Sequence, residues 1–110
     1  MKAAKDDRFW ASEMCGVIDA TARIVARGKD TFFDPANSVE FGAARMAVID
    51  LDVAAENLSD EYKAARPDLP WKQLARTRDK YAHHYSDIDR EVVWNLLINR
   101  LPELAMALRD

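Results

Sequence analysis

Apolar residues recur every three or four positions over most of this chain, which is the spacing of amphipathic helices rather than of strands. The first helix is predicted to begin at Asp6 or Asp7 and to run to about Ala26, with Gly28 as a stop signal just beyond it. Its apolar face consists of Phe9, Trp10, Met14, Val17, Ile18, Thr21, Ile24 and Val25.

Residues 30–37 interrupt the helical pattern. They include Pro35, and we interpret them as a connection without regular structure. The adjacent Phe32 and Phe33 are too apolar for an exposed loop, so we expect them to fix this connection to the core.

A second long helix is predicted from Asn37 or Ser38, either of which can cap it, to about Leu58. Its apolar residues form two neighbouring stripes. One stripe consists of Gly42, Met46, Ile49 and Val53, and the other of Ala44, Val48, Leu51, Ala55 and Leu58. So wide an apolar arc indicates packing on more than one side. Because the chain is short, we expect the second partner to be another copy, which predicts a homodimer.

Two more helices follow in the pattern. Ser59 can cap a short helix over 60–65 that Pro67 ends, and Trp71 opens a helix of about a dozen residues directly after Pro70.

A last helix follows a break at 86–89, where Ser86, Asp87 or Asp89 could cap it. Its apolar face consists of Val93, Leu97, Leu101, Leu104 and Leu108. Pro102 should kink or split this helix near Leu101. The chain therefore reads as an all-α bundle of four main helices plus one short helix, and we expect residues 1–110 to form a single domain.

Composition fits a small globular protein outside the membrane. About half of the 110 residues are apolar, and no apolar run approaches the roughly 20 residues of a membrane helix. The N-terminus has no apolar segment behind its lysines, so we expect no signal peptide. The single cysteine, Cys15, cannot form an internal disulfide, which favours the cytoplasm. Its place beside an apolar stripe favours a small buried hydrophobe over a nucleophile.

Positive charge is concentrated in one segment. The formal net charge is −3, yet Trp71–Tyr85 carries Lys72, Arg76, Arg78 and Lys80 against Asp79 alone, so the remainder totals −6. Such a strip suits a local phosphate site and equally suits a solvated helix face.

The same segment holds the candidate chemistry. Arg78 falls on or beside the apolar side of its helix, which is costly unless a carboxylate of another helix or a phosphate meets it. His83, His84 and Tyr85 follow where the helix should end. On a regular helix Arg78 and His83 are about 140° apart. They converge only if the helix loosens near Ala82 or if two copies meet across a symmetric interface.

His83, His84 and Tyr85 also have possible structural roles that involve no chemistry. The histidines could simply compensate the helix dipole, and Tyr85 could cap the core with its ring. Adjacent histidines make a poor metal pair, and no cysteine pair or H-E-x-x-H motif assists them, so we expect neither a metal nor a cofactor.

In this setting, Arg78-x4-His83-x-Tyr85 resembles the R-x4-H-x-Y motif of HepT proteins, which are toxins of the HEPN superfamily. The resemblance extends from about Ala43 to Leu108. Further landmarks that match in order are Leu58-Ser59, Glu61, Pro70-Trp71, Asp89, Val93-Trp94 and Leu101-Pro102.

The resemblance implies a HEPN-like helical bundle that forms a homodimer, with the two motif helices around a cleft. It also implies a metal-independent ribonuclease that cleaves RNA, transfer RNA included, as the toxin of a type VII toxin–antitoxin system. Arg78 and His83 would be catalytic, with Asp79 and His84 as supporting candidates. Tyr85 would be the residue to which an MntA-like minimal nucleotidyltransferase, the antitoxin, transfers AMP.

Three positions depart from the family pattern. Asp79 replaces a usual Asn, His84 replaces a usual acidic residue, and Asp52-Val53 stands where Gly-Glu is typical, so a commonly acidic position is apolar. Because Asp79 puts a negative charge beside the phosphate site, it favours an alternative: a non-catalytic HEPN subunit that binds a nucleotide or pairs with a nucleotidyltransferase. A purely structural helical module is a third interpretation.

Overall fold

Helices account for all the regular secondary structure in the computed structural model, which describes residues 5–83 and 88–109. The elements are α1 (Asp7–Ala26), α2 (Lys29–Phe33), α3 (Val39–Glu56), α4 (Asp60–Ala64), α5 (Trp71–His83), α6 (Arg90–Asn95), the π-helical turn η2 (Leu96–Arg100) and α7 (Leu101–Arg109). This confirms the all-α fold predicted from the sequence.

Local chemistry sets where the helices begin and end. Asp6, Ser59 and Asp89 each accept a hydrogen bond from a backbone N–H in the first turn of the following helix, at 2.9, 3.1 and 2.8 Å. Gly28 adopts a φ of 95°, which only glycine reaches without strain, and it separates α1 from α2. The Ser59 and Asp89 caps and this stop were predicted, and the Asp6 cap fits the predicted start of the first helix. The other predicted caps of the last helix, Ser86 and Asp87, lie outside the described residues.

In the region before α3 one sequence prediction was wrong and one was confirmed. The segment expected to be a connection contains the helix α2, which has five residues, as α4 does. Burial explains this turn, since Phe32 is fully buried and its ring lies 5.0 Å from that of Trp94, between centroids. Of the two residues predicted to cap α3, Asn37 does so, since its side chain accepts the Val39 N–H at 3.2 Å, whereas Ser38 makes no side-chain cap.

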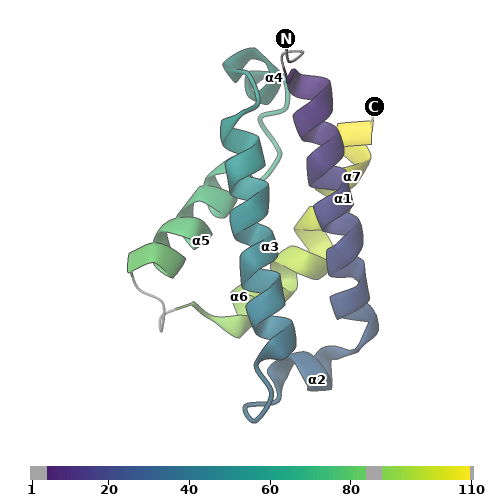
Figure 1. Cartoon of the computed structure of the whole chain (residues 1–110), viewed down its shortest axis with the longest axis vertical. Coiled ribbons are helices and arrows are strands. Elements are labelled where there is room, and N and C mark those ends of the chain that lie inside the picture. The colour runs from purple at the N-terminus through teal and green to yellow at the C-terminus, as the bar shows by residue number, and fades with distance from the viewer. Residues whose placement is uncertain (1–4, 84–87, 110) are drawn as a thin grey trace.

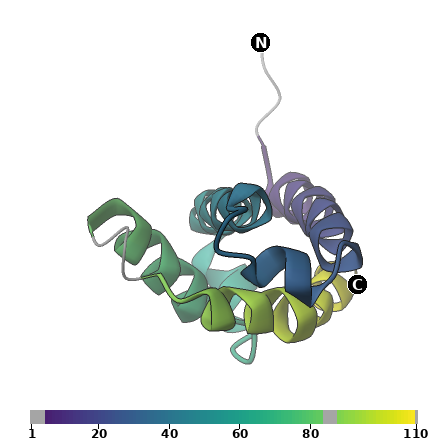
Figure 2. The same ribbon diagram turned by 90° about the horizontal axis from the view of Figure 1, so that it is seen from below.

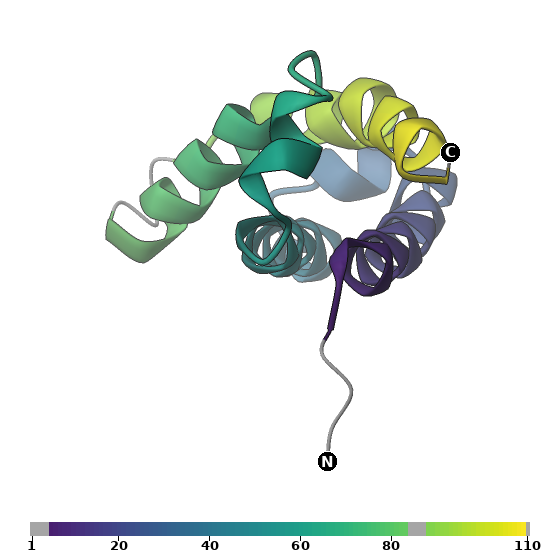
Figure 3. The same ribbon diagram turned by 90° about the horizontal axis from the view of Figure 1, so that it is seen from above.

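The helices form two layers with α5 at the edge. Helices α1 and α3 lie side by side and form one layer. The run α6–η2–α7 forms the second layer and crosses one face of this pair (Figure 1 and Figure 2). Helix α2 closes one end of the bundle. Helix α5 packs against α3. The C-terminal half of α5 projects beyond the other helices in the views from below and from above (Figure 2 and Figure 3).

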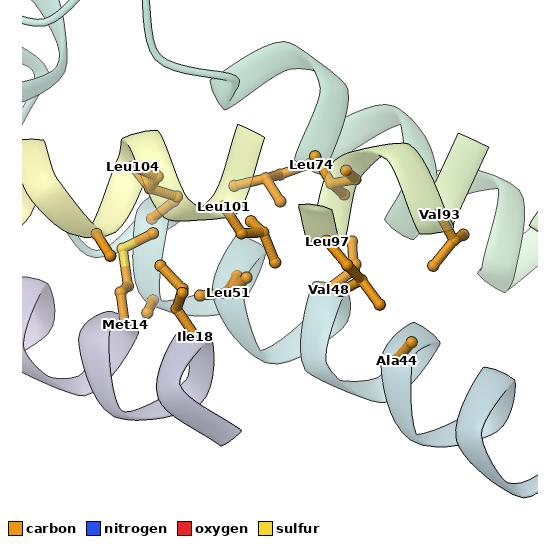
Figure 4. Close-up of a cluster of buried hydrophobic side chains, with 14 of the residues drawn as sticks. Met14, Ile18, Ala44, Val48, Leu51, Leu74, Val93, Leu97, Leu101 and Leu104 are labelled. Atoms are coloured by element: carbon orange, nitrogen blue, oxygen red, sulfur yellow. The ribbon is translucent and has the colours of Figure 1, made fainter. Parts of the chain in front are cut away.

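One cluster of apolar side chains fills the space between the layers. Met14, Leu51, Leu74 and Leu101 are fully buried and come from α1, α3, α5 and α7 respectively, with their side chains directed toward one another (Figure 4). Burying a side chain of this size stabilises the fold by roughly 1.5–3 kcal/mol. Leu74 thereby fixes α5 to the bundle. Among the described residues, no helix has the length and apolarity to span a membrane.

Pro102 alters the last helix as predicted. Proline lacks a backbone N–H and its ring clashes with the carbonyl four residues earlier, so a regular α-helix cannot pass through it undisturbed. The chain widens into η2 immediately before Leu101 and resumes as α7 from Leu101 onward. The predicted split near Leu101 therefore takes the form of a π-helical turn.

Candidate functional site

Helix α5 has a buried side and an open side. Leu74 and Thr77 are buried, and Trp71 and Tyr81 pack against the core cluster with part of their surface exposed. Trp71 also donates its Nε1–H to the backbone carbonyl of Arg66 at 3.0 Å. Trp71, Leu74 and Tyr81 therefore belong to the side of α5 that packs against the bundle.

Arg78 points from α5 toward α3, where two carboxylates meet it. Its Nη1 lies 2.7 Å from Glu56 Oε1 and 3.5 Å from Asp52 Oδ2. The Arg78 side chain remains 41% exposed, whereas the Asp52 side chain is only 5% exposed. The inter-helix salt bridge that we considered for Arg78 is therefore present. A guanidinium has five N–H donors, and those on Nε and Nη2 make no hydrogen bond within the described chain, so Arg78 keeps donors for an anion.

Asp52 occupies an unusual electrostatic position. Burial raises the pKa of its carboxyl, and the negative charges of Glu56 and Asp79 raise it further, while Arg78 opposes them. Asp52 thus holds a proton more readily than an exposed aspartate does. Its carboxyl group fixes one edge of the Arg78 guanidinium, whose exposed edge is left for a ligand.

His83 is the last residue of α5 and is exposed. The helix remains regular through Ala82, so the loosening that could have turned His83 toward Arg78 does not occur. On such a helix the two side chains leave the axis about 140° apart. Within one chain, therefore, α5 does not bring Arg78 and His83 to one point.

The supporting candidates are only partly described. Asp79 is exposed on α5, and after burial and the charge of Glu56 its own negative charge also raises the pKa of the Asp52 carboxyl. His84 and Tyr85 lie outside the described residues, so their predicted roles stay predictions.

An exposed apolar stripe on α3 lies beside the two carboxylates that contact Arg78. The two stripes of α3 differ in burial: Ala44, Val48, Leu51, Ala55 and Leu58 are all buried. In the other stripe Met46 is 49% and Val53 40% exposed, and Gly42 and Ile49 are half-buried. Val53 follows Asp52 directly, so this apolar stripe adjoins the carboxylates that hold Arg78.

Asp52 and Glu56 were not predicted as members of the site. We noted that Val53 leaves a commonly acidic position apolar, but a carboxylate is present one residue earlier and is buried. A signal existed, because Asp52 follows Val48 by four positions and so sits at the edge of a buried stripe. A carboxylate in that position requires a cation from another helix.

Other site classes find little support in the described residues. Burial raises the pKa of the Cys15 thiol, which disfavours the reactive thiolate and agrees with the structural role expected for it. Residues 5–83 and 88–109 contain no group of three or more His, Cys, Asp or Glu side chains placed to hold a metal ion.

Comparison with known proteins identifies relatives of this chain. A family model described as ribonuclease HepT-like matches residues 17–110. A protein of Methanocaldococcus jannaschii named as a candidate RNase is 43% identical over 49 residues, 44% of this chain and 40% of that protein. A probable ribonuclease HepT of Thermococcus cleftensis is 35% identical over 51 residues, 46% of each chain.

A third relative matches over a slightly longer stretch of residues. A candidate RNase of Caldanaerobacter subterraneus is 30% identical over 57 residues, 52% of this chain and 51% of that protein. The chain thus spans about half, or less, of the length of the curated relatives it matches. No solved structure matches the chain.

Proposed function

This chain belongs to the HepT-like ribonuclease family, and we propose that it is a metal-independent ribonuclease whose active site is completed by two copies of the chain. The substrate is RNA, with transfer RNA as the first to test. Arg78 and His83 are the catalytic residues, and Asp52 and Glu56 are positioning residues that orient Arg78.

The ribonuclease assignment rests on the family match over residues 17–110, and the observation that carries the two-copy active site is the divergence of Arg78 and His83 on a regular α5. Residues 140° apart on one helix serve a single phosphate only if the second comes from another molecule. A two-fold interface pairs Arg78 of one copy with His83 of the other. Two features of α3 and α5 support such an interface: the exposed stripe around Met46 and Val53, and the projecting C-terminal half of α5 (Figure 2).

The chemistry suits these two side chains. A histidine takes the proton from the ribose 2′-hydroxyl, and the 2′-oxygen bonds to the adjacent phosphorus as the bond to the 5′-oxygen breaks. The departing 5′-oxygen takes a proton from water or from the imidazolium. Arg78 stabilises the extra negative charge on the phosphorus oxygens with the N–H groups that the carboxylates leave unused.

Cleavage of RNA by the purified protein in excess chelator tests the proposal. We expect wild type to cut bulk transfer RNA and both Arg78→Ala and His83→Ala to lose activity with unchanged helicity. His84→Ala is the necessary control, because a neighbouring histidine could substitute; we expect its loss to be the smaller one. Undiminished cutting by both Arg78→Ala and His83→Ala would refute the catalytic assignment.

We also propose that the chain is the toxin of a toxin–antitoxin pair that modification of Tyr85 silences. The tyrosine hydroxyl would attack the α-phosphorus of ATP on an MntA-like nucleotidyltransferase, releasing pyrophosphate and leaving AMP on the phenol oxygen. The added phosphate can occupy the donors of Arg78 and so exclude RNA. This proposal rests on family membership and on the R-x4-H-x-Y spacing.

Mass spectrometry after co-expression with such a nucleotidyltransferase tests the switch. We expect a nucleotide mass on the peptide that contains Tyr85 and none in Tyr85→Phe, which should remain toxic. A neutralised complex with unmodified Tyr85 would leave inhibition to binding alone and reject the switch.

One observation favours the non-catalytic alternative. Asp52 and Glu56 already engage Arg78 Nη1, and Asp79 adds negative charge nearby, so an incoming phosphate meets a locally acidic surrounding. A HEPN subunit that binds nucleotide without cutting RNA would show ATP binding that depends on Arg78 and no cleavage by wild type. The cleavage assay above separates the two functions.

A further inference from the structure

The open side of α5 carries a row of cations. Lys72, Arg76 and Lys80 are four residues apart, all exposed, and fall within an arc of about 80° that spans roughly 12 Å of the helix. We call these three residues the outer basic strip. His83 lies inside the same arc, one turn beyond Lys80, whereas Arg78 lies on the far side. The strip therefore leads to His83.

No carboxylate in the described chain neutralises the strip. The ion pairs of residues 5–83 and 88–109 involve Arg27, Arg78, Arg100 and Arg109, and none includes Lys72, Arg76 or Lys80. Asp79 is the one acidic residue of α5, at the edge of the strip. Three unpaired cations in a row on a chain of net charge −3 repel each other, which favours an external anion.

Two hollows flank the strip and meet at Gln73 and Arg76. The larger has a volume of about 600 Å³, and its charged lining consists of Lys63, Lys72, Arg76 and Arg100, without a carboxylate. Arg100 is engaged by Glu103 at 2.8 Å, so the other three cations remain available. The smaller hollow, about 260 Å³, contains Arg76 and Lys80 together with Asp89, the cap of α6.

We propose that the outer basic strip binds the phosphate backbone of the RNA substrate and directs it to His83. This inference rests on the proposed ribonuclease function and adds a binding surface to it. The rise of four helical residues, about 6 Å, places successive cations at a spacing suited to successive nucleotides of an extended strand. Backbone contacts of this kind carry no base information, so the strip supplies affinity and register but not sequence preference.

Salt-dependent binding of a fluorescein-labelled single-stranded RNA tests the strip. The protein carries His83→Ala so that no cleavage intervenes, and the test variant adds Lys72→Gln, Arg76→Gln and Lys80→Gln. The matched control instead adds changes at three exposed cations elsewhere that also lower the net charge by three: Arg8→Gln, Arg23→Gln and Lys29→Gln.

We expect the strip variant to bind at least about tenfold more weakly at moderate salt, and the slope of log K against log salt to fall by about 2 for three lost phosphate contacts. The control should change affinity less than about twofold. Equal affinity of the strip and control variants overturns the proposal.

The two proposals fail separately. If wild type does not cut RNA but binding depends on the strip, the ribonuclease function fails and the strip stands. If wild type cuts RNA, and a chain that keeps His83 but carries Lys72→Gln, Arg76→Gln and Lys80→Gln binds and cuts as wild type does, the strip fails alone. If the same three changes in a chain that keeps His83 leave RNA binding intact but prevent neutralisation by a co-expressed nucleotidyltransferase, the surface belongs to an acidic protein partner and the proposal is overturned.

Discussion

Helix α5 carries its cations in two different ways. Arg78, on the side facing α3, has one nitrogen held by Glu56 at 2.7 Å and by the buried Asp52 at 3.5 Å. Lys72, Arg76 and Lys80, on the open side, have no carboxylate partner among the described residues. A cation fixed by carboxylates keeps one orientation and suits a transition state, whereas unpaired flexible cations suit a moving, sequence-independent ligand.

His83→Ala should have the largest effect, because it removes the catalytic group to which the cations on the open side of α5 lead. General acid–base catalysis by histidine contributes about 10²–10⁴-fold, so we expect RNA cleavage to fall by that order. Because His83 is exposed at the end of α5, the melting temperature should stay within about 2 °C of wild type. Cleavage rates and a thermal melt measure both quantities. Retained cleavage would place the chemistry elsewhere.

Arg78→Lys should have the next largest effect. Lysine keeps the charge but has all its donors on one nitrogen, so the α3 carboxylates and a phosphate compete for that nitrogen and the bidentate geometry of the guanidinium is lost. We expect about 10–10²-fold slower cleavage under single-turnover conditions. Stability should drop by no more than about 1 kcal/mol, since the Arg78 side chain is 41% exposed. Wild-type rates in this variant would mean that charge alone suffices and that the α3 carboxylates do not orient a catalytic group.

Met46→Glu tests the proposed dimer interface, which would bring Arg78 of one copy to His83 of the other. It puts a charge into the exposed stripe of α3, and we expect about tenfold weaker dimerisation or more, measured by light scattering over a dilution series. Met106 on α7 is 70% exposed and lies outside the stripe, so Met106→Glu is the matched control and should leave the mass unchanged. A wild-type chain that is monomeric at micromolar concentration would contradict the interface.

Asp52→Asn should have the smallest effect, and its sign depends on pH. The folded-state pKa of Asp52 lies above its unfolded value, so the folded protein binds this proton more tightly. The free energy of unfolding therefore falls as pH rises from the unfolded pKa through the folded pKa, and stays reduced above it. Asparagine removes this penalty.

We expect the Asp52→Asn melting temperature at neutral pH to equal or exceed that of wild type by a few degrees, with 1 kcal/mol worth roughly 4–8 °C in a domain this size. The advantage should vanish in acid. Asp50→Asn removes a charge from an exposed position of the same helix and is the control. A large loss of stability in Asp52→Asn at neutral pH would show that the charged pair with Arg78 stabilises the fold.

Local features of the sequence predicted most of the fold. Caps such as Ser59 and Asp89 act within three residues, and the effect of Pro102 is equally local, so both follow from the sequence. Helix α2 did not follow, because it depends on burying Phe32 against Trp94, which is 62 residues away along the chain. Tertiary contact decided that turn, not helix propensity.

The candidate site, like the fold, was predictable from the sequence only where its features are local. That Arg78 needs a carboxylate or a phosphate followed from its place beside an apolar side. Which carboxylate it meets did not, because Asp52 and Glu56 precede it by 26 and 22 residues and only the packing of α3 on α5 brings them close. The divergence of Arg78 and His83 was predictable from helical geometry alone, and α5 retains it through its last residue.

Complementation between two inactive variants tests the shared active site most directly. Arg78→Ala and His83→Ala chains with different affinity tags are co-expressed, and the mixed dimer is isolated and assayed for RNA cleavage. If each site takes Arg78 from one copy and His83 from the other, one of its two sites is intact, and the mixed dimer should show about half of wild-type activity. A mixed dimer as inactive as either parent would contradict the account, because it would place both residues in the same copy's site.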